Sequence, residues 1–144
     1  MQLLPFERRW ILTIFDTIYP GGHPVLPWKA SEVATTGPFV DDMFRVGPFW
    51  TILGMRALIW IMNWVGPLLA LGLPLPFAWI SDAARLRTLE NLAGSRFYLV
   101  REIPTLFKML GSMAYCASAD VQKAVGFERP DFGLPAWVNE VSRG

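Results

Sequence analysis

Few residues of this chain have side chains suited to catalysis, and they stand apart in the sequence. The single histidine, His23, has no nucleophile or carboxylate in local register, so we expect an exposed loop residue rather than a catalytic base. The single cysteine, Cys116, cannot form an internal disulfide, and we expect a small buried hydrophobic residue. Asp41 and Asp42 are neighbours whose side chains would diverge by about 100° on a helix, which favours a solvated face over a carboxylate pair.

The common redox and metal centres do not fit this inventory. A c-type haem needs two cysteines and a histidine, an iron–sulfur cluster needs several thiolates, and a structural zinc site needs four ligands. The acidic residues are scattered and lack the spacing of a calcium loop. We therefore predict no catalytic, cofactor-binding or metal-ligating residue here and place any redox chemistry on another chain.

Two arginines are better suited to recognition. Arg96 and Arg101 lie beside apolar helix surface, where a guanidinium can bridge to carboxylates or carbonyls of another chain. Ordinary surface charge is the alternative. We add Tyr115, Gly126 and Phe127 to these partner-interface candidates, because they are expected to form a packed corner whose role could also be structural only.

The composition leaves more apolar surface than a small domain can bury. Of 144 residues, 53% are hydrophobic and 17% charged, and the mean hydropathy is +0.34. The surplus must face lipid, a partner chain or both. The tryptophans proposed for that surface, which could also fill a core contact, are Trp50, Trp60, Trp64 and Trp79. A net charge of +1 without a basic stripe excludes nucleic acid as a partner.

The chain reads as one all-α domain over residues 1–144, because helical periodicity recurs and strand alternation does not. Prolines and glycines over 20–38 predict a loop without regular structure. The expected helices cover residues 6–19, 39–46, 49–65, 81–93, 99–115 and 120–125. Pro104 should kink the fifth helix or mark its start.

Within two of these helices the periodicity assigns inner faces. Leu86, Leu89 and either Leu92 or Ala93 are expected to point inward from the helix over 81–93. In the next helix the expected inner face is Leu99, Ile103, Leu106, Phe107, Leu110 and Met113. The tail over 129–144 is expected to lie over another surface.

The uncharged run over residues 57–81 is long enough to cross a bilayer. Gly66-Pro67, Gly72, Pro74 and Pro76 argue instead for two shorter apolar pieces, which we expect to form a helical hairpin. These pieces would lie at the membrane interface, dip into one leaflet or be covered by a partner. Because the N-terminus does not resemble a signal peptide, we expect membrane association on the cytoplasmic side.

Several sequence pieces resemble, in order, the accessory small subunits of glucose–methanol–choline (GMC) type flavoenzymes. The match covers about residues 4–20 and 50–130. The pieces are Leu4-Pro5-Phe6-Glu7-Arg8-Arg9, Phe15-Asp16-Thr17-Ile18-Tyr19-Pro20-Gly21, Arg56-Ala57-Leu58-Ile59-Trp60 before Gly66, Arg85-Leu86-Arg87-Thr88-Leu89-Glu90 with Ser95-Arg96-Phe97 and Arg101, and Tyr115 with Asp120-Val121 and Val125-Gly126-Phe127-Glu128-Arg129-Pro130. Phe127 departs from the tyrosine usual in that closing pattern.

This resemblance is to the gluconate 2-dehydrogenase subunit 3-like proteins and the N-terminal region of long-chain fatty alcohol oxidases. It implies a non-catalytic subunit of an oxidoreductase complex, with FAD and hydride transfer on a separate large chain. The flavin-binding Gly-x-Gly-x-x-Gly motif does not occur in this sequence. The alternatives are a small membrane protein with one span through 57–81 and a small lipid-binding protein.

Overall fold

The computed structural model describes residues 2–127, and this part of the chain is helical without a strand. The all-α prediction is confirmed. In chain order the elements are α1 (Pro5–Ile18), η1 (Ala30–Glu32), α2 (Thr36–Val46), α3 (Phe49–Trp64), α4 (Gly66–Leu71), η2 (Phe77–Trp79), α5 (Asp82–Ala93), α6 (Tyr98–Cys116) and α7 (Ala119–Ala124), where η marks a 3-10 helix.

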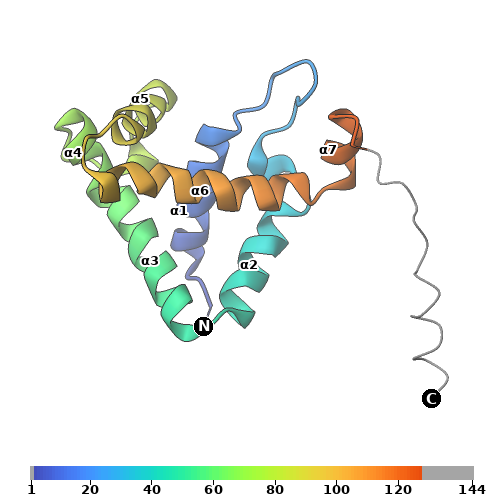
Figure 1. The fold of residues 1–144 in the computed structure, drawn as a ribbon, viewed down its shortest axis with the longest axis horizontal. Helices are drawn as coiled ribbons and strands as arrows, with labels where there is room; N and C mark the ends of the chain where they lie inside the picture. The colour runs from blue at the N-terminus through green and yellow to red at the C-terminus, as the bar shows by residue number, and fades with distance from the viewer. Residues whose placement is uncertain (1, 128–144) are drawn as a thin grey trace.

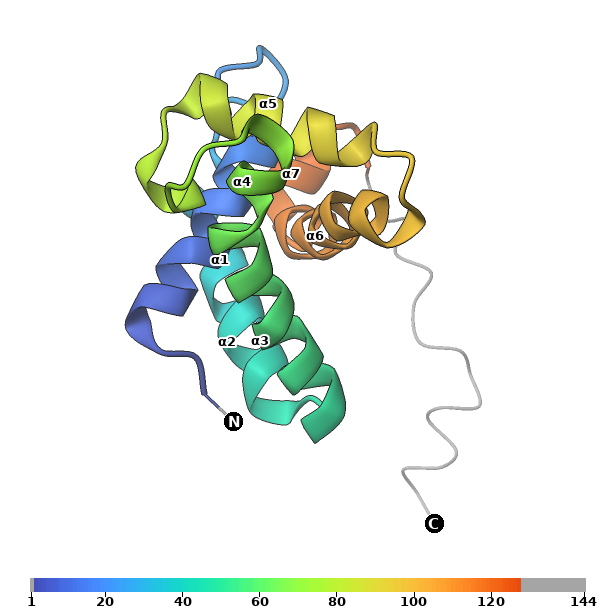
Figure 2. The same ribbon diagram turned by 90° about the vertical axis from the view of Figure 1, so that its left-hand side faces the viewer.

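The longest helix, α6, lies across the other long helices (Figure 1). Behind it α1 occupies the centre, and α2 and α3 splay apart from the turn that joins them. The short α4 packs against α5 at one end of the molecule (Figure 2). α1 contacts α3, α5 and α6, so the first helix of the chain is also the central one.

Most helix boundaries fall where local chemistry predicted them. α1 ends just before the Pro-Gly-Gly stretch, and Gly47-Pro48 separates α2 from α3. The hydroxyl oxygen of Ser81 accepts a hydrogen bond from the Ala84 amide at 3.3 Å, which caps the first turn of α5. Gly126 has a φ of +73°, a left-handed conformation that glycine adopts readily, and it follows α7 closely.

Two expectations about these elements need correction. The stretch over 20–38 is not without regular structure, because it contains η1 and the start of α2 at Thr36. There the Thr35 hydroxyl donates to the Ala114 carbonyl at 3.0 Å and ties the start of α2 to α6. Pro104 does not mark the start of α6, which begins at Tyr98.

The uncharged run over 57–81 is divided among α3, α4 and η2. Val65 separates the first two helices, and Gly72, with a φ of +68°, ends α4 in a left-handed conformation. Among residues 2–127, none of the helices combines the length and the apolar composition that a bilayer crossing requires.

The core lies between α1, α6 and the surrounding helices. α1 contributes Ile11, Ile14 and Phe15, all essentially inaccessible to solvent. The other large buried side chains are Val33, Val40, Phe44, Ile52, Ile59, Met62, Phe77, Ile80, Leu89, Leu92, Phe107, Tyr115 and Val121. Leu86 was assigned to the inner face of α5 but is exposed. Thr88 is buried instead, and its hydroxyl donates to the Ala84 carbonyl at 2.8 Å.

Candidate interaction surfaces

A buried ion pair fixes α3 against α1. Glu7, in the first turn of α1, is fully buried, and both of its carboxylate oxygens are hydrogen-bonded. Arg56 donates from Nε to Oε1 at 2.6 Å and from Nη2 to Oε2 at 2.5 Å. Trp60 donates its indole N–H to Oε1 at 2.8 Å, and the Leu4 amide donates to Oε2 at 2.9 Å. Four donors thus compensate for the removal of one carboxylate from water.

Two opposing effects set the proton affinity of this carboxylate. Burial by itself would raise the pKa of Glu7, because the charged form loses its hydration. The hydrogen bonds from Arg56, the Leu4 amide and Trp60, together with the positive charge of Arg56, outweigh burial and hold that pKa below its ordinary value of 4.5. The group is therefore ionised at neutral pH and serves as a structural anion.

Aromatic rings extend this joint between α1 and α3. Trp60 packs edge-on against Phe6 and Trp10, with ring centroids 5.9 and 5.2 Å apart. The Phe6 and Trp10 rings are themselves 4.9 Å apart. The sequence allowed Trp60 either a lipid or partner surface or a core contact; its ring takes part in this contact and remains 41% exposed.

The outer side of α3 and the segment after it carry an apolar surface that nothing in residues 2–127 covers. We call it the tryptophan surface and define it by Trp50, Leu53, Trp64, Leu68 and Trp79, all exposed. Trp50 and Trp79 are 79% and 76% accessible, values far above those of tryptophans in a domain core. Side chains of this size on a fixed helix are suited to a nonpolar partner or to the membrane interface.

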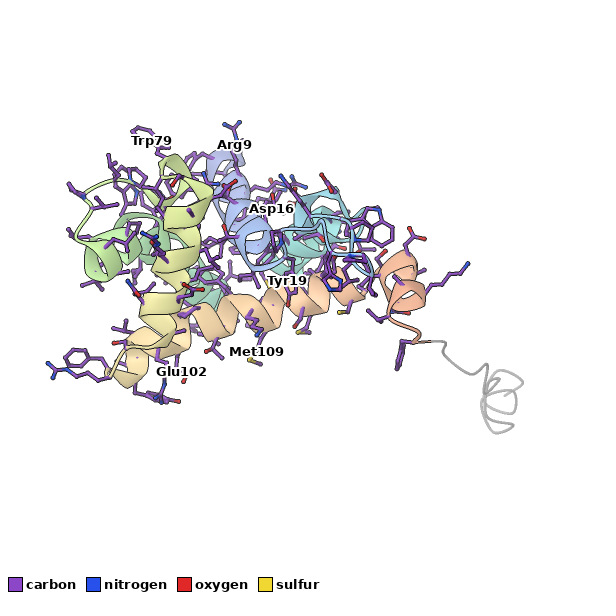
Figure 3. All side chains as sticks on the ribbon, turned by 90° about the horizontal axis from the view of Figure 1, so that it is seen from above. Arg9, Asp16, Tyr19, Trp79, Glu102 and Met109 are labelled. Carbon is purple, nitrogen blue, oxygen red and sulfur yellow. The ribbon has the colours of Figure 1, made fainter. Side chains whose placement is uncertain are left out.

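Trp79 is held at this surface by groups from two helices. Arg85 of α5 donates to the carbonyls of Phe77 and Ala78 at 3.0 and 2.6 Å. Asn63 of α3 accepts a hydrogen bond from the Ala78 amide at 3.1 Å. Buried Phe77 anchors the same short helix, so the turn that presents Trp79 is fixed on both sides. Trp79 lies at the edge of the molecule in Figure 3.

Tyr115 lies inside the fold, at the crossing of α6 with the end of α1. Its ring stacks on that of Tyr19 with centroids 4.9 Å apart, and its hydroxyl donates to the Trp28 carbonyl at 2.9 Å. Burial raises the pKa of both tyrosines, because the phenolate would lose its hydration. Tyr115 thus binds the loop after α1 to α6.

The other candidates from the sequence do not share this location. Gly126 and Phe127 follow α7, where the Phe127 amide donates to the Gln122 carbonyl at 2.8 Å and its ring is 58% exposed. Arg96 and Arg101 are exposed near the start of α6, and their guanidinium carbons lie 5.2 and 5.7 Å from the rings of Phe97 and Tyr98. Their interface role stays a prediction. The tail over 129–144 lies outside the described residues.

The expected inner face of α6 is only partly correct. Phe107 is fully buried, and Ile103 and Leu110 are partly buried. Leu99, Leu106 and Met113 are instead 79%, 38% and 59% exposed, because the helix presents Pro104, Phe107, Gly111 and Ala114 to the core. Met109, which the sequence did not single out, projects from the side of α6 that faces away from α1 (Figure 3).

The residues considered for chemistry remain scattered. His23 is exposed, and its Nδ1 accepts a hydrogen bond from the Val25 amide at 3.2 Å. Cys116 is exposed rather than buried as predicted, because Ala114 and Tyr115 take the inward positions of that turn. Asp41 pairs with Arg8, and Asp42 with Arg45, both at the surface. Within residues 2–127 no three histidine, cysteine, aspartate or glutamate side chains gather in a way that could hold a metal ion.

A hollow lies between α1, the loop after it and the start of α5. It encloses about 380 Å³, and its polar lining includes Asp16, Lys29 and Arg85. The Asp16 carboxylate accepts a hydrogen bond from the Ser31 amide at 2.7 Å. The Arg85 guanidinium donates to the carbonyls of η2 and forms an ion pair with Asp82 at 2.9 Å. These partners give the side chains structural roles.

Sequence reasoning missed the Glu7–Arg56–Trp60 joint, although a signal for it was present. Arg56 is the only charged residue of α3, and a lone charge in an apolar helix calls for a partner. Comparison with known proteins returned no matching family model, no matching curated protein and no matching solved structure.

Proposed function

We propose that this chain is a non-catalytic accessory subunit that binds and stabilises a separate FAD-dependent GMC-type alcohol or sugar dehydrogenase or oxidase. The observation that carries the proposal is the amount of large apolar side chain left exposed on well-anchored helices. Trp50, Trp64 and Trp79 belong to this set on one side, and Leu99 and Met109 on another. The family resemblance supplies the class of partner.

The mechanism is binding. In the proposed complex, the exposed helices bury their apolar side chains against the catalytic chain, which holds FAD and performs hydride transfer. Burial of apolar surface contributes about 25 cal/mol per Å². A contact of standard size buries roughly 800 Å² on each partner. Rigid elements such as the turn that carries Trp79 lose little conformational freedom on binding, which favours association.

A second part of the proposal concerns the membrane. The segment over 57–81 is uncharged, and it carries Trp64, Leu68 and Trp79 of the tryptophan surface. We propose that α3 and α4, with the turn between them, act as an apolar hairpin that rests in the headgroup region on the cytoplasmic side. Tryptophan favours this depth, because its ring is apolar and its N–H can reach water.

Coexpression tests the subunit role. The chain is produced alone and together with a neighbouring reading frame that encodes a large protein with a Gly-x-Gly-x-x-Gly start. We expect the two chains to copurify, and we expect the large chain to retain FAD and to melt at a higher temperature in the complex. A chain that is folded and monodisperse alone, and that neither copurifies with the flavoprotein nor changes its melting temperature, would contradict the proposal.

A further inference from the structure

The outward side of α6 carries a regular apolar stripe. We call it the outer stripe and define it by Leu99, Leu106, Met109 and Met113, which are 79%, 38%, 58% and 59% exposed. At 3.6 residues per turn these four positions fall within an arc of about 80°. The opposite side of the same helix packs into the core through Phe107 and Ala114. α6 therefore has one apolar face buried in the core and a second apolar face exposed.

A basic edge lies to one side of the outer stripe, beyond Thr105 and Ser112. Arg101 and Lys108 are seven residues apart, so they project on nearly the same line of the helix, about 80° around it from Met109, the nearest stripe residue. Both are exposed, and within residues 2–127 neither lies in an ion pair. The acid of α6, Glu102, falls within the arc of the stripe and is partly buried (Figure 3).

This pattern of charge distinguishes among possible occupants. A lipid surface would draw Glu102 toward hydrocarbon together with Leu99 and Met109, which is unfavourable for a carboxylate. In an antiparallel pair formed through the outer stripe, a second copy of the chain would place its own basic edge beside that of the first, and the like charges would repel. A helix of another protein matches better, because its own apolar residues recur at spacings of three and four and its flanks can carry acids.

We propose that the outer stripe docks an amphipathic helix from another protein chain, with acidic residues along the flank that faces Arg101 and Lys108. The inference rests on the proposed function, in which the flavoprotein subunit supplies that helix. The apolar side chains provide affinity, and the basic edge sets the orientation and excludes helices with basic flanks.

Two designed peptides test this specificity on the full chain. Each has 21 residues with leucine at the a and d heptad positions, and carries either glutamate or lysine at the flanking positions; like charges keep each peptide from pairing with itself. Fluorescence anisotropy should show that the glutamate peptide binds roughly tenfold more tightly than the lysine peptide at low salt. Arg101→Glu with Lys108→Glu should reverse the preference.

A matched variant controls for net charge. Arg9→Glu with Arg45→Glu changes the charge by the same amount at exposed sites on other helices, and Arg9 lies on the far side of the molecule from Met109 (Figure 3). It should keep the preference for the glutamate peptide. Met109→Gln with Met113→Gln should weaken binding of that peptide at least fivefold, because it removes apolar contact without adding charge. Circular dichroism verifies that each variant is folded.

Several results would overturn the inference. These are equal affinity for the two peptides, a preference that survives reversal of Arg101 and Lys108, or full binding by the Met109 and Met113 variant. A dimer in sedimentation equilibrium that the same two glutamines disrupt would make a second copy the occupant. If the chain binds anionic phosphatidylglycerol vesicles through Arg101, Lys108, Met109 and Met113 and does not bind the peptides, the occupant is lipid.

The flavoprotein separates this inference from the proposed function. In one outcome the wild-type chain copurifies with the flavoprotein, and the Arg101→Glu/Lys108→Glu and Met109→Gln/Met113→Gln variants do so equally well. In that case the outer stripe is not the docking site, although the subunit role stands. If the charge-dependent peptide preference holds but the flavoprotein does not bind, the proposed function fails and the docking surface stands.

Discussion

At the scale of single residues, the ion pair between Glu7 and Arg56 is the most constrained feature of the fold. Glu7 is inaccessible to solvent, whereas the Arg56 side chain retains 23% of its accessibility. Arg56 and Trp60 lie 49 and 53 residues from Glu7 in the sequence, so their hydrogen bonds to its carboxylate join α3 to α1. Removal of one partner would leave the other charge desolvated and unpaired. The free-energy cost of that unpaired charge is larger than the net stabilisation that the intact pair provides.

Glu7→Gln should lower the free energy of unfolding by roughly 3 kcal/mol, because Arg56 then loses its counter-charge at a mostly desolvated site. Asp41→Asn is the matched comparison, since it breaks the exposed pair with Arg8 and should lower that free energy by less than about 1 kcal/mol. Urea unfolding followed by circular dichroism measures both. Equal effects of the two substitutions would show that the burial of Glu7 has no energetic weight.

The same carboxylate predicts a dependence of stability on pH. Its pKa is lower in the folded chain than in the unfolded chain, so the unfolded chain takes up the proton first as the pH falls. The stabilisation is complete above the unfolded value of about 4.5 and is lost as the pH falls through the lower folded value. The stability difference between wild type and Glu7→Gln should therefore shrink below about pH 4.5. A difference constant from pH 3 to 7 would contradict this assignment.

At the scale of helices, two glycines in helix interiors should respond in opposite ways to the same substitution. A Cβ at Gly54 of α3 would meet nothing within 4 Å, whereas one at Gly111 of α6 would lie 3.1 Å from both the Phe15 and Tyr19 rings. Gly54→Ala should raise the free energy of unfolding by about 0.5–1 kcal/mol through helix propensity. Gly111→Ala should lower it, because Phe15 is fixed in the core. Thermal melts of both variants test the pair.

Helix boundaries were predictable because they depend on local chemistry. The Ser81 cap, the Gly47-Pro48 break and the stop after Ile18 need no distant contact. The inward face of a helix depends on its neighbours, which periodicity alone does not identify. Both sides of α6 are apolar, so the same spacing describes buried Phe107 and exposed Leu99.

The candidate surfaces were predictable in composition but not in position. The composition allowed Trp50, Trp64 and Trp79 either an outer apolar surface or a core contact, and in the structure each is exposed. Tyr115 was grouped with Phe127, although the stack on Tyr19 takes it into the fold. The pairing of Glu7 with Arg56 could not be read from spacing, since it depends on how α1 and α3 cross.

At the scale of the molecule, the tryptophan surface should govern membrane binding and not folding. Replacing Trp50, Trp64 and Trp79 by serine should change the melting temperature little, because these rings are largely exposed. The variant should float with phosphatidylcholine–phosphatidylglycerol vesicles less than half as well as wild type, because each buried indole contributes apolar area. Leu86→Ser, an exposed apolar site on α5, is the control and should float like wild type.

The central position of α1 also has a consequence for biosynthesis. α1 leaves the ribosome well before α6, the helix that covers part of its apolar side, because the contact residues of α6 are made about one hundred positions later. At 5–20 residues per second, Ile11, Ile14 and Phe15 would wait roughly 5–20 s before that cover is translated. During this interval the nascent chain presents a bare apolar helix, which is the kind of segment that chaperones and membrane surfaces retain.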